Sequence, residues 1–229
     1  MDYRAFYADH QTDIPVLDHR LRSVIAMVGD LGDRRLLDIG CGRATLLNEL
    51  ARLHPGAALT GIDVRDEAAG PFTYVSHDLT TGLPFGDASF EVVTFGEVIE
   101  HLPDPDAMLG EIRRVLVPGG TLVITTPNLV SWANRVLVPL GIQPLMTETS
   151  TAANLGRRWK VLGQGNEVQG HLKIFTHRSL AEILELTGFE VLQRAGSTTR
   201  FPQPVAVVDR LAARFPSLAS VLVYRCRRP

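Results

Sequence analysis

The chain has 229 residues, of which 45% are hydrophobic and 21% charged, and its formal net charge is −2 with a pI of about 6.4. This composition is that of an ordinary globular domain, and the slightly acidic balance argues against a polyanionic partner such as a nucleic acid. Cys41 and Cys226 stand far apart, which excludes a disulfide framework or a zinc knuckle built on paired cysteines. Because no apolar run is long enough to span a membrane and the first residues lack a signal pattern, we expect a cytoplasmic protein without a transmembrane segment.

Apolar residues at helical spacing predict a first helix within residues 13–30, which ends near Gly29 or Gly32. Short apolar runs then alternate with helical patterns along the chain. The expected elements are strand 36–39, helix 45–53, strands 57–64, 72–79 and 90–98, a helix through Met108, Ile112 and Val115, a turn at 117–120, and strand 121–128. Strands that alternate with helices in this way predict a parallel α/β sheet.

The regular pattern is interrupted between residues 128 and 170. This stretch combines apolar pieces, a polar run, the basic sequence GRRWK and a glycine-rich run. It is too long for a plain connection, so we interpret it as a substrate-lid insertion within a single domain of residues 1–229. Regularity returns afterwards, and the expected elements are a helix between a cap at Thr176 and Gly188, strand 189–196, helix 204–216 and strand 220–228.

A glycine-rich turn follows the first strand, with Gly40 and Gly42 in the sequence LLDIGCGRA. Glycines at this place let the backbone approach a ligand, and the start of the next helix is a polar site. Asp63 ends the second strand and lies 23 residues after Gly40. This is the distance at which a Rossmann-like fold places an acid on ribose hydroxyls, so the pattern predicts a nucleoside-containing ligand.

Together with this turn, the sequences GIDV, SHDL, GEVIEHLPDP, RVLVPGGTLVITTPN and FTHRSLAEILELTGFEV resemble the class I S-adenosylmethionine-dependent methyltransferases over residues 30–198. The resemblance implies a Rossmann-like fold with a seven-stranded sheet, its last strand antiparallel, and helices on both sides. It implies S-adenosylmethionine as cofactor and S-adenosylhomocysteine as product. Ala44 stands where the family usually has a third glycine, and the segment between strands two and three is shorter than usual.

The resemblance also assigns cofactor-binding residues. Asp38, Gly40 and Gly42 would surround the methionine part, and Asp63 would accept from the ribose hydroxyls. Near the adenine would lie Asp78 and Leu79, with Asp78 accepting from the exocyclic amine. The residues expected near the transferring methyl group are Gly96 and Glu97.

Glu97, Glu100 and His101 follow the fourth strand in the sequence FGEVIEHLPDP. If these residues begin a helix, their spacing of i, i+3 and i+4 places all three side chains on one side of it. Two carboxylates and an imidazole at the carboxyl end of a parallel sheet suit a divalent cation. Carboxylates near a helix start also have a purely structural reading, because they favour the helix dipole.

The E-x-x-E-H run is similar to the metal site of the small-RNA 3′-terminal 2′-O-methyltransferases and of the ubiquinone-pathway O-methyltransferases. That similarity implies Glu97, Glu100, His101 and His171 as ligands of Mg or Mn; His177 is the weaker candidate for the last histidine. A hydroxyl nucleophile must lose its proton, which requires a metal or a general base. Without a metal, His101 would be the base, so His101 and Glu97 are the candidate catalytic residues.

The sequence thus predicts methyl transfer from S-adenosylmethionine to an oxygen of a small molecule, assisted by a divalent metal. N-methylation stays open. So do an RNA 3′-terminal 2′-O-methyltransferase, which the charge opposes, and a non-catalytic protein that binds the cofactor. Whether residues 128–170 close over the acceptor or pack on a second copy in a homodimer is also open.

Overall fold

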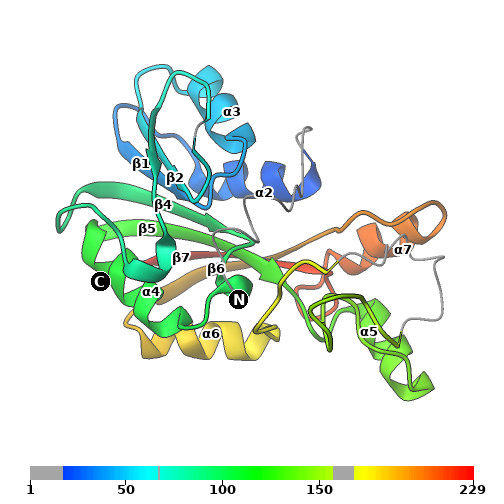
Figure 1. Ribbon diagram of the computed structural model, residues 1–229. Helices are drawn as coiled ribbons and strands as arrows, with labels where there is room; N and C mark the ends of the chain where they lie inside the picture. The colour runs from blue at the N-terminus through cyan, green and yellow to red at the C-terminus, as the bar shows by residue number, and fades with distance from the viewer. Residues whose placement is uncertain (1–17, 67, 157–167) are drawn as a thin grey trace.

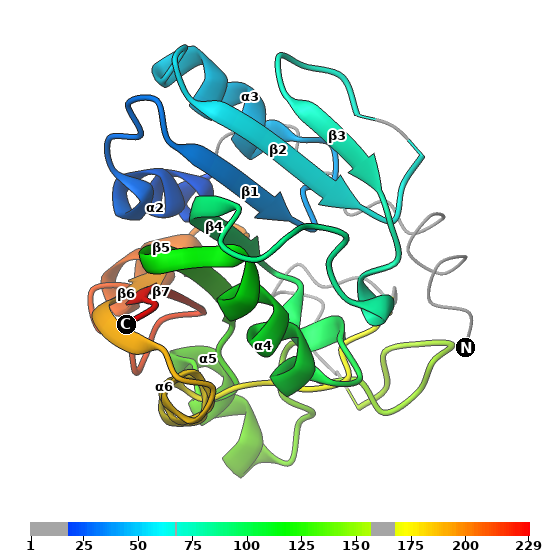
Figure 2. The ribbon, with the colours of Figure 1, turned by 90° about the vertical axis from the view of Figure 1, so that its left-hand side faces the viewer.

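The computed structural model describes residues 18–66, 68–156 and 168–229 of the chain (Figure 1). They form a seven-stranded sheet in which every strand is parallel except one near the end of the chain, which pairs antiparallel with both of its neighbours (Figure 2). The spatial order is β3 (Thr73–Ser76), β2 (Ala58–Asp63), β1 (Arg35–Ile39), β4 (Phe90–Gly96), β5 (Leu116–Pro127), β7 (Val221–Arg227) and β6 (Glu190–Ser197). This confirms the expected fold, including the antiparallel last strand.

Helices cover both faces of the sheet (Figure 1). They are α2 (His19–Val28), α3 (Thr45–Leu53), α4 (Pro105–Val115), α5 (Trp132–Leu137), α6 (His177–Leu186) and α7 (Val205–Ala212), with short 3₁₀ turns η1 (Leu79–Thr81), η2 (Ile99–His101) and η3 (Val138–Leu140). One core lies between the sheet and α2 and α3, and a second lies between the sheet and α4 and α6. No helix among the described residues is both long and apolar enough to cross a membrane.

The period of two along the strands divides their side chains between the two cores. In β1, Leu37 and Ile39 pack with α4 and α6, whereas Leu36 packs with α2 and α3. In β5, Ile124 packs in the core with α4 and α6, and Val123 packs in the core with α2 and α3. Successive residues of a strand point to opposite faces, so this alternation decides which residues at the strand ends face which side of the molecule.

The helix ends follow the expected capping chemistry. The side chain of Asp18 caps α2, whose last residue precedes Gly29 with φ +72°. Thr176 and Ser179 form a reciprocal capping box at the start of α6, and Gly188 follows that helix with a positive φ.

Several expected boundaries are wrong. The strand expected over 90–98 ends at Gly96, and the helix expected over 204–216 ends at Ala212. β5 begins at Leu116 rather than at residue 121, so the turn expected at 117–120 lies inside the strand. Leu116 pairs with Phe90 and Thr121 with Val92, so the four residues between them bulge out of the ladder. β3 ends at Ser76, because the side chain of Asp78 caps the turn η1 instead of extending the strand.

The segment expected as an insertion leaves and rejoins the domain at one place. Asn128 and Phe175 form an isolated bridge, and the Leu129 amide donates to the Phe175 carbonyl at 2.9 Å. Of the described residues between them, those at 132–140 form α5 and η3, and those at 141–156 and 168–174 form no helix or strand (Figure 1). The basic GRRWK sequence falls, except for its glycine, outside the described residues.

Candidate functional site

The glycine-rich turn after β1 comes close to neighbouring backbone and side chains. The Gly40 amide donates to the Ile62 carbonyl at 2.8 Å, and a Cβ on Gly40 would lie 2.3 Å from Cγ2 of Val98. Gly40 and Gly42 both have positive φ, as the turn requires. Ala44, at the third position, also adopts the left-handed conformation, with φ +58°, and is fully buried. The left-handed turn therefore forms here with a methyl group at its third position.

Asp63, at the end of β2, lies against this turn. Its Oδ2 accepts from the Gly42 amide at 2.8 Å, and its Oδ1 accepts from the Arg65 amide at 3.2 Å. A carboxylate can accept about four hydrogen bonds, so this acid retains acceptor capacity for hydroxyls of a ligand. Asp63 thus orders the loop and presents oxygen atoms beside it, as the sequence pattern predicts.

Asp38 is buried near the end of β1, and Thr94 Oγ1 donates to its Oδ1 at 2.7 Å. Burial raises the pKa of Asp38 to about 7, although Thr94 and the positive charge of Arg20 both oppose this rise. A carboxyl in this environment is close to half-ionised near neutral pH, and a cationic group of a ligand would complete its ionisation.

Arg20, on α2, is not among the residues expected from the sequence. Only 9% of its surface is exposed, and its positive charge acts on Asp38, Glu97 and Glu100. Its guanidinium also borders Gly96, where a Cβ would lie 3.2 Å from Arg20 Nη1. The sequence did hold a signal, because Arg20 occupies a position of the buried stripe that continues with Val24, Met27 and Val28.

Asp78 and Leu79 lie where β3 passes into η1. One carboxylate oxygen of Asp78 accepts from both the amide and the hydroxyl of Thr80, at 2.9 and 2.7 Å. Leu79 is partly buried against the larger core. The structure therefore gives Asp78 a capping role within the chain, beside the role at the adenine that the resemblance implies.

Glu97 and Glu100 diverge because they bond to neighbouring residues of β5. Thr125 Oγ1 donates to Glu97 and Thr126 Oγ1 donates to Glu100, each at 3.0 Å. Adjacent strand residues point to opposite faces, so the two hydroxyl groups hold the two carboxylates in different directions, while the charge of Arg20 acts on both. Glu97 has φ +57° and precedes η2, so it is not on a helical turn with Glu100 and His101. The expectation that Glu97, Glu100 and His101 share one side of a helix is therefore wrong.

Glu100 is completely buried, and its Oε1 has no hydrogen-bond partner among the described residues. Burial, and after it the negative charge of Glu97, raise its pKa well above the usual range. A buried carboxylate oxygen without a partner is costly in a folded protein, so its retention points to a function.

His101 and His171 lie beside Glu100, with a distance of 4.8 Å between the two ring centroids. His101 Nδ1 lies 3.3 Å from the Gly170 carbonyl oxygen, and His171 Nδ1 lies 2.9 Å from the Met146 carbonyl oxygen. A carbonyl can only accept, so each Nδ1 carries the proton and each lone pair is on Nε2. Burial, and after it the charge of His171, lower the pKa of His101 to about 4, so its ring is neutral at neutral pH.

The side chains of Glu100, His101 and His171 form the donor group, whose ligand atoms all lie within 4.8 Å of one another. His101 Nε2 is 4.0 Å from Glu100 Oε1. A transition-metal ion bonded at about 2.1–2.2 Å needs donors no more than about 4.4 Å apart, so shifts of a few tenths of an ångström would close the site. Of the four expected ligands the structure brings together these three, and Glu97 lies outside the group.

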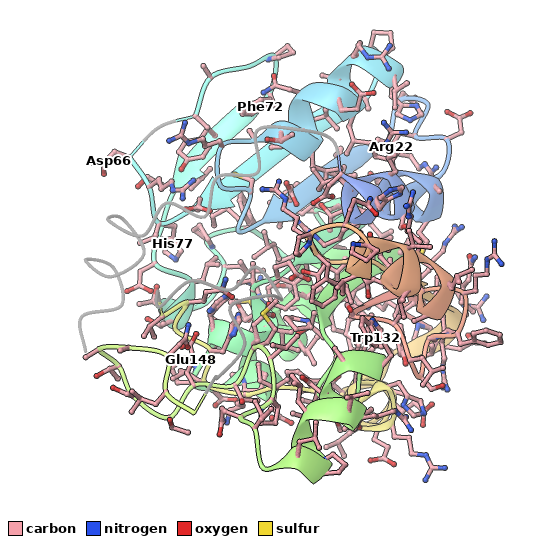
Figure 3. All side chains as sticks on the ribbon, turned by 90° about the vertical axis from the view of Figure 1, so that its right-hand side faces the viewer. Arg22, Asp66, Phe72, His77, Trp132 and Glu148 are labelled. Atoms are coloured by element: carbon pink, nitrogen blue, oxygen red, sulfur yellow. The ribbon has the colours of Figure 1, made fainter. Side chains whose placement is uncertain are left out.

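Glu148, labelled in Figure 3, holds the backbone of the segment that carries His171. Its carboxylate accepts from the amides of Gln169, Gly170 and His171 at 2.6, 2.8 and 3.2 Å. The amides of Leu172 and Lys173 in turn donate to the Glu100 carbonyl. Glu148 therefore fixes the backbone on which His171 stands, a role that the sequence pattern does not reveal.

Comparison with known proteins identifies the domain. A family model described as a methyltransferase domain matches residues 11–194. A Mycolicibacterium smegmatis protein named a probable S-adenosylmethionine-dependent methyltransferase is 32% identical over 164 residues, which cover 70% of this chain and 62% of that protein. The ubiquinone biosynthesis O-methyltransferase of Aeromonas salmonicida is 29% identical, with 77% of this chain and 71% of that protein covered. Two further ubiquinone biosynthesis O-methyltransferases, and a ubiquinone/menaquinone biosynthesis C-methyltransferase of Desulfotalea psychrophila that is 36% identical, align over about half of their own length.

The fold has solved counterparts as well. The methyltransferase in a complex with the Haloferax volcanii Trm112 methyltransferase activator superposes with a TM-score of 0.69 at 19% identity, and covers 100% of this chain and 98% of that chain. A Burkholderia thailandensis N-methyltransferase with bound S-adenosylhomocysteine superposes over 99% of this chain and 82% of its own, with a TM-score of 0.55 at 19% identity.

Proposed function

The chain belongs to the class I S-adenosylmethionine-dependent methyltransferases, and from that premise we propose that it methylates a hydroxyl oxygen of a small molecule with the help of a divalent cation. The relatives named as ubiquinone biosynthesis O-methyltransferases favour an oxygen acceptor. The turn at Gly40 and Gly42, with acids at Asp38 and Asp63, fits the cofactor that the family uses.

The donor group carries this proposal. Glu100 offers a buried oxygen without a hydrogen-bond partner, and His101 and His171 offer Nε2 lone pairs in rings held by carbonyl oxygens. Hydrogen bonds of this kind orient the imidazole ligands in most metal sites. Mg²⁺ prefers oxygen donors alone, so two imidazoles and one carboxylate favour Mn²⁺ or a similar transition-metal ion.

Each residue of the site then has a task. S-adenosylmethionine, when bound, supplies a methyl group on a sulfonium centre. With the cofactor bound, Asp63 would accept from the ribose, Asp38 would face the amino group, and Arg20 would pair with the carboxylate. A cation held by the donor group would lower the pKa of an acceptor hydroxyl and orient it. Without a cation His101 would be a poor base, because a pKa of about 4 lies far below that of a hydroxyl.

We assign the choice of acceptor to residues 128–170, which carry Glu148 and end beside the donor group. Trp132 and Leu145 pack with Phe201 in a small apolar cluster at the root of this segment. Because the segment reaches His171 through Glu148, closure over an acceptor would tighten the donor group at the same time.

We expect methyl transfer to a panel of catechol-like and other hydroxylated acceptors to require a divalent cation. Mn²⁺ should bind saturably to protein that is filled with S-adenosylhomocysteine, and His171→Ala should lose that binding. Activity should vanish on treatment with a chelator and return with Mn²⁺. Calorimetry and radiolabel transfer measure the two effects. Full activity in the chelator, or transfer to amines only, would contradict the proposal.

Cofactor affinity should fall as the pH is lowered through neutrality. The pKa of Asp38 is about 7 in the ligand-free protein, and an ammonium group beside it would lower that pKa. Binding then expels a proton below pH 7, so the affinity should fall by up to about tenfold per pH unit below that point. Calorimetry with S-adenosylhomocysteine in buffers of different ionisation enthalpy measures this release, and Asp38→Asn should flatten the profile. An unchanged wild-type affinity in this range would show that Asp38 does not face the amino group.

A further inference from the structure

Exposed apolar side chains are concentrated on α5, η3 and α7. Among the described residues, twelve large hydrophobic side chains are exposed, and seven of them belong to these three short elements or the turn that follows α7. These seven are between 45% and 60% exposed, and they are Val136, Val138, Leu140, Val207, Val208, Leu211 and Phe215. Such a concentration on one part of a protein marks an interaction site rather than the ordinary scatter of surface residues.

The only charged side chains that these elements expose are positive. Segments 129–147 and 198–220 contain four arginines, all exposed, which are Arg135, Arg200, Arg210 and Arg214. Their single acidic residue, Asp209, is fully buried and accepts from Trp132 Nε1 and the Thr199 amide. A chain with 25 acidic residues and a net charge of −2 therefore presents no exposed carboxylate in these segments.

The elements form one unit at one end of the molecule (Figures 1 and 3). Trp132 of α5 bonds to Asp209 of α7, and Arg135 donates to the Ser217 carbonyl. α5 follows β5, and α7 joins the end of β6 to the start of the antiparallel β7. Both therefore lie at the carboxyl edge of the sheet, the edge that also carries Glu97, Glu100 and His101.

We propose that the α5–α7 surface, made of these seven apolar residues and four arginines, binds the surface of an anionic lipid membrane. Short helices with apolar side chains beside basic ones lie in the plane of a bilayer interface. Arginines without neighbouring carboxylates match the negative potential of anionic lipids. An acidic protein or a second copy of this chain would be the competing occupant, but a second copy would bring four further arginines against the first four.

Flotation of the full chain with lipid vesicles tests this. We expect binding to phosphatidylcholine vesicles that contain phosphatidylglycerol, weaker binding to pure phosphatidylcholine, and release by salt. Leu211→Gln with Phe215→Gln should weaken the binding at least about tenfold. Arg210→Gln with Arg214→Gln should weaken it by roughly thirtyfold, since each basic residue at an anionic surface contributes roughly a fivefold factor.

Matched controls lie on α6. Leu186→Gln and Arg178→Gln alter an exposed apolar and an exposed basic residue outside the α5–α7 surface and should leave binding unchanged. Thermal melting checks that all variants fold.

Absence of flotation with anionic vesicles, or equal loss of binding in the α6 variants, would overturn the proposal. Sedimentation velocity tests the alternative of a second copy. If the wild type does not bind vesicles but forms a dimer, and the variant with Leu211→Gln and Phe215→Gln is a monomer, the surface belongs to a dimer interface. Flotation requires no methyl transfer, so it fails or succeeds independently of the catalytic proposal.

Discussion

Replacement of Glu100 by glutamine is expected to abolish cation-dependent methyl transfer and, at the same time, to stabilise the ligand-free protein. The carboxylate is buried, one of its oxygens lacks a partner, and Glu97 adds a second negative charge nearby. Glutamine keeps the acceptor for Thr126 and removes the charge. We expect the rate to fall by about 10³-fold, within the range for loss of a proton-activating group, and Mn²⁺ binding to weaken by at least about 100-fold.

The gain in stability should depend on pH. Burial raises the pKa of Glu100 in the folded state, so the folded protein holds a proton that the unfolded chain has released. The pKa of this group in the unfolded chain is about 4. Its contribution to the free energy of unfolding is fully present below that pH and is lost as the pH rises toward the pKa in the folded state. In a chelating buffer above neutral pH, Glu100→Gln should raise the melting temperature by about 2–4 °C, which corresponds to about 1 kcal/mol for a chain of this size. The difference should shrink in acid.

Glu148→Gln is the matched comparison, because it alters the support of His171 without removing a donor. It should weaken Mn²⁺ binding by only about 10–100-fold, the usual effect of a group behind a metal ligand, and it should not stabilise the protein. Equal melting curves for the wild type and Glu100→Gln at every pH would mean that the buried carboxyl group of Glu100 does not destabilise the folded protein. Retained Mn²⁺-dependent activity in Glu100→Gln would remove Glu100 from the donor group.

The fold could be predicted because its signals are local. Alternation of apolar residues along β1 and β5, the glycine turn before α3 and the cap at Thr176 each act within a few residues of the chain. The sequence also names Glu100, His101 and His171, the last of them from the resemblance to known metal sites, and the structure brings their side chains together. The signals of the fold act locally, whereas the position of His171 beside Glu100 depends on how two distant segments meet.

The remaining features depend on tertiary contacts that no local pattern encodes. Glu97 leaves the donor group because its backbone is left-handed and because Thr125 and Thr126 point to opposite faces of β5. Glu148 acts through backbone amides more than twenty residues away. Arg20 lies on a helix that precedes the glycine turn, so only its place in a buried stripe distinguishes it from a surface arginine.

The role proposed for Arg20 can be separated from that of Asp63 by the choice of ligand. S-adenosylhomocysteine contains the amino-acid carboxylate, whereas 5′-methylthioadenosine lacks it and keeps the ribose and adenine. Arg20→Met should weaken binding of S-adenosylhomocysteine by about 10–100-fold, the loss expected for one or more hydrogen bonds between charged groups, with little change for 5′-methylthioadenosine. Asp63→Asn should weaken the binding of both ligands by a similar factor, because Asp63 acts at the ribose, which both ligands contain. Calorimetry or fluorescence titration measures all four combinations.

Stability distinguishes a binding role of Arg20 from a purely structural one. The positive charge of Arg20 acts on the buried Asp38 and Glu100 and on the partly buried Glu97, so its removal takes a stabilising charge away from all three carboxyl groups. We expect Arg20→Met to lower the free energy of unfolding by about 3 kcal/mol at neutral pH, as for one member of a buried ion pair. Adding Glu97→Gln should recover part of this loss without restoring the preference for S-adenosylhomocysteine. If the double variant regained both stability and ligand preference, Arg20 would act only by balancing the buried charges; if it regained stability alone, Arg20 would be the residue that holds the carboxylate of the cofactor.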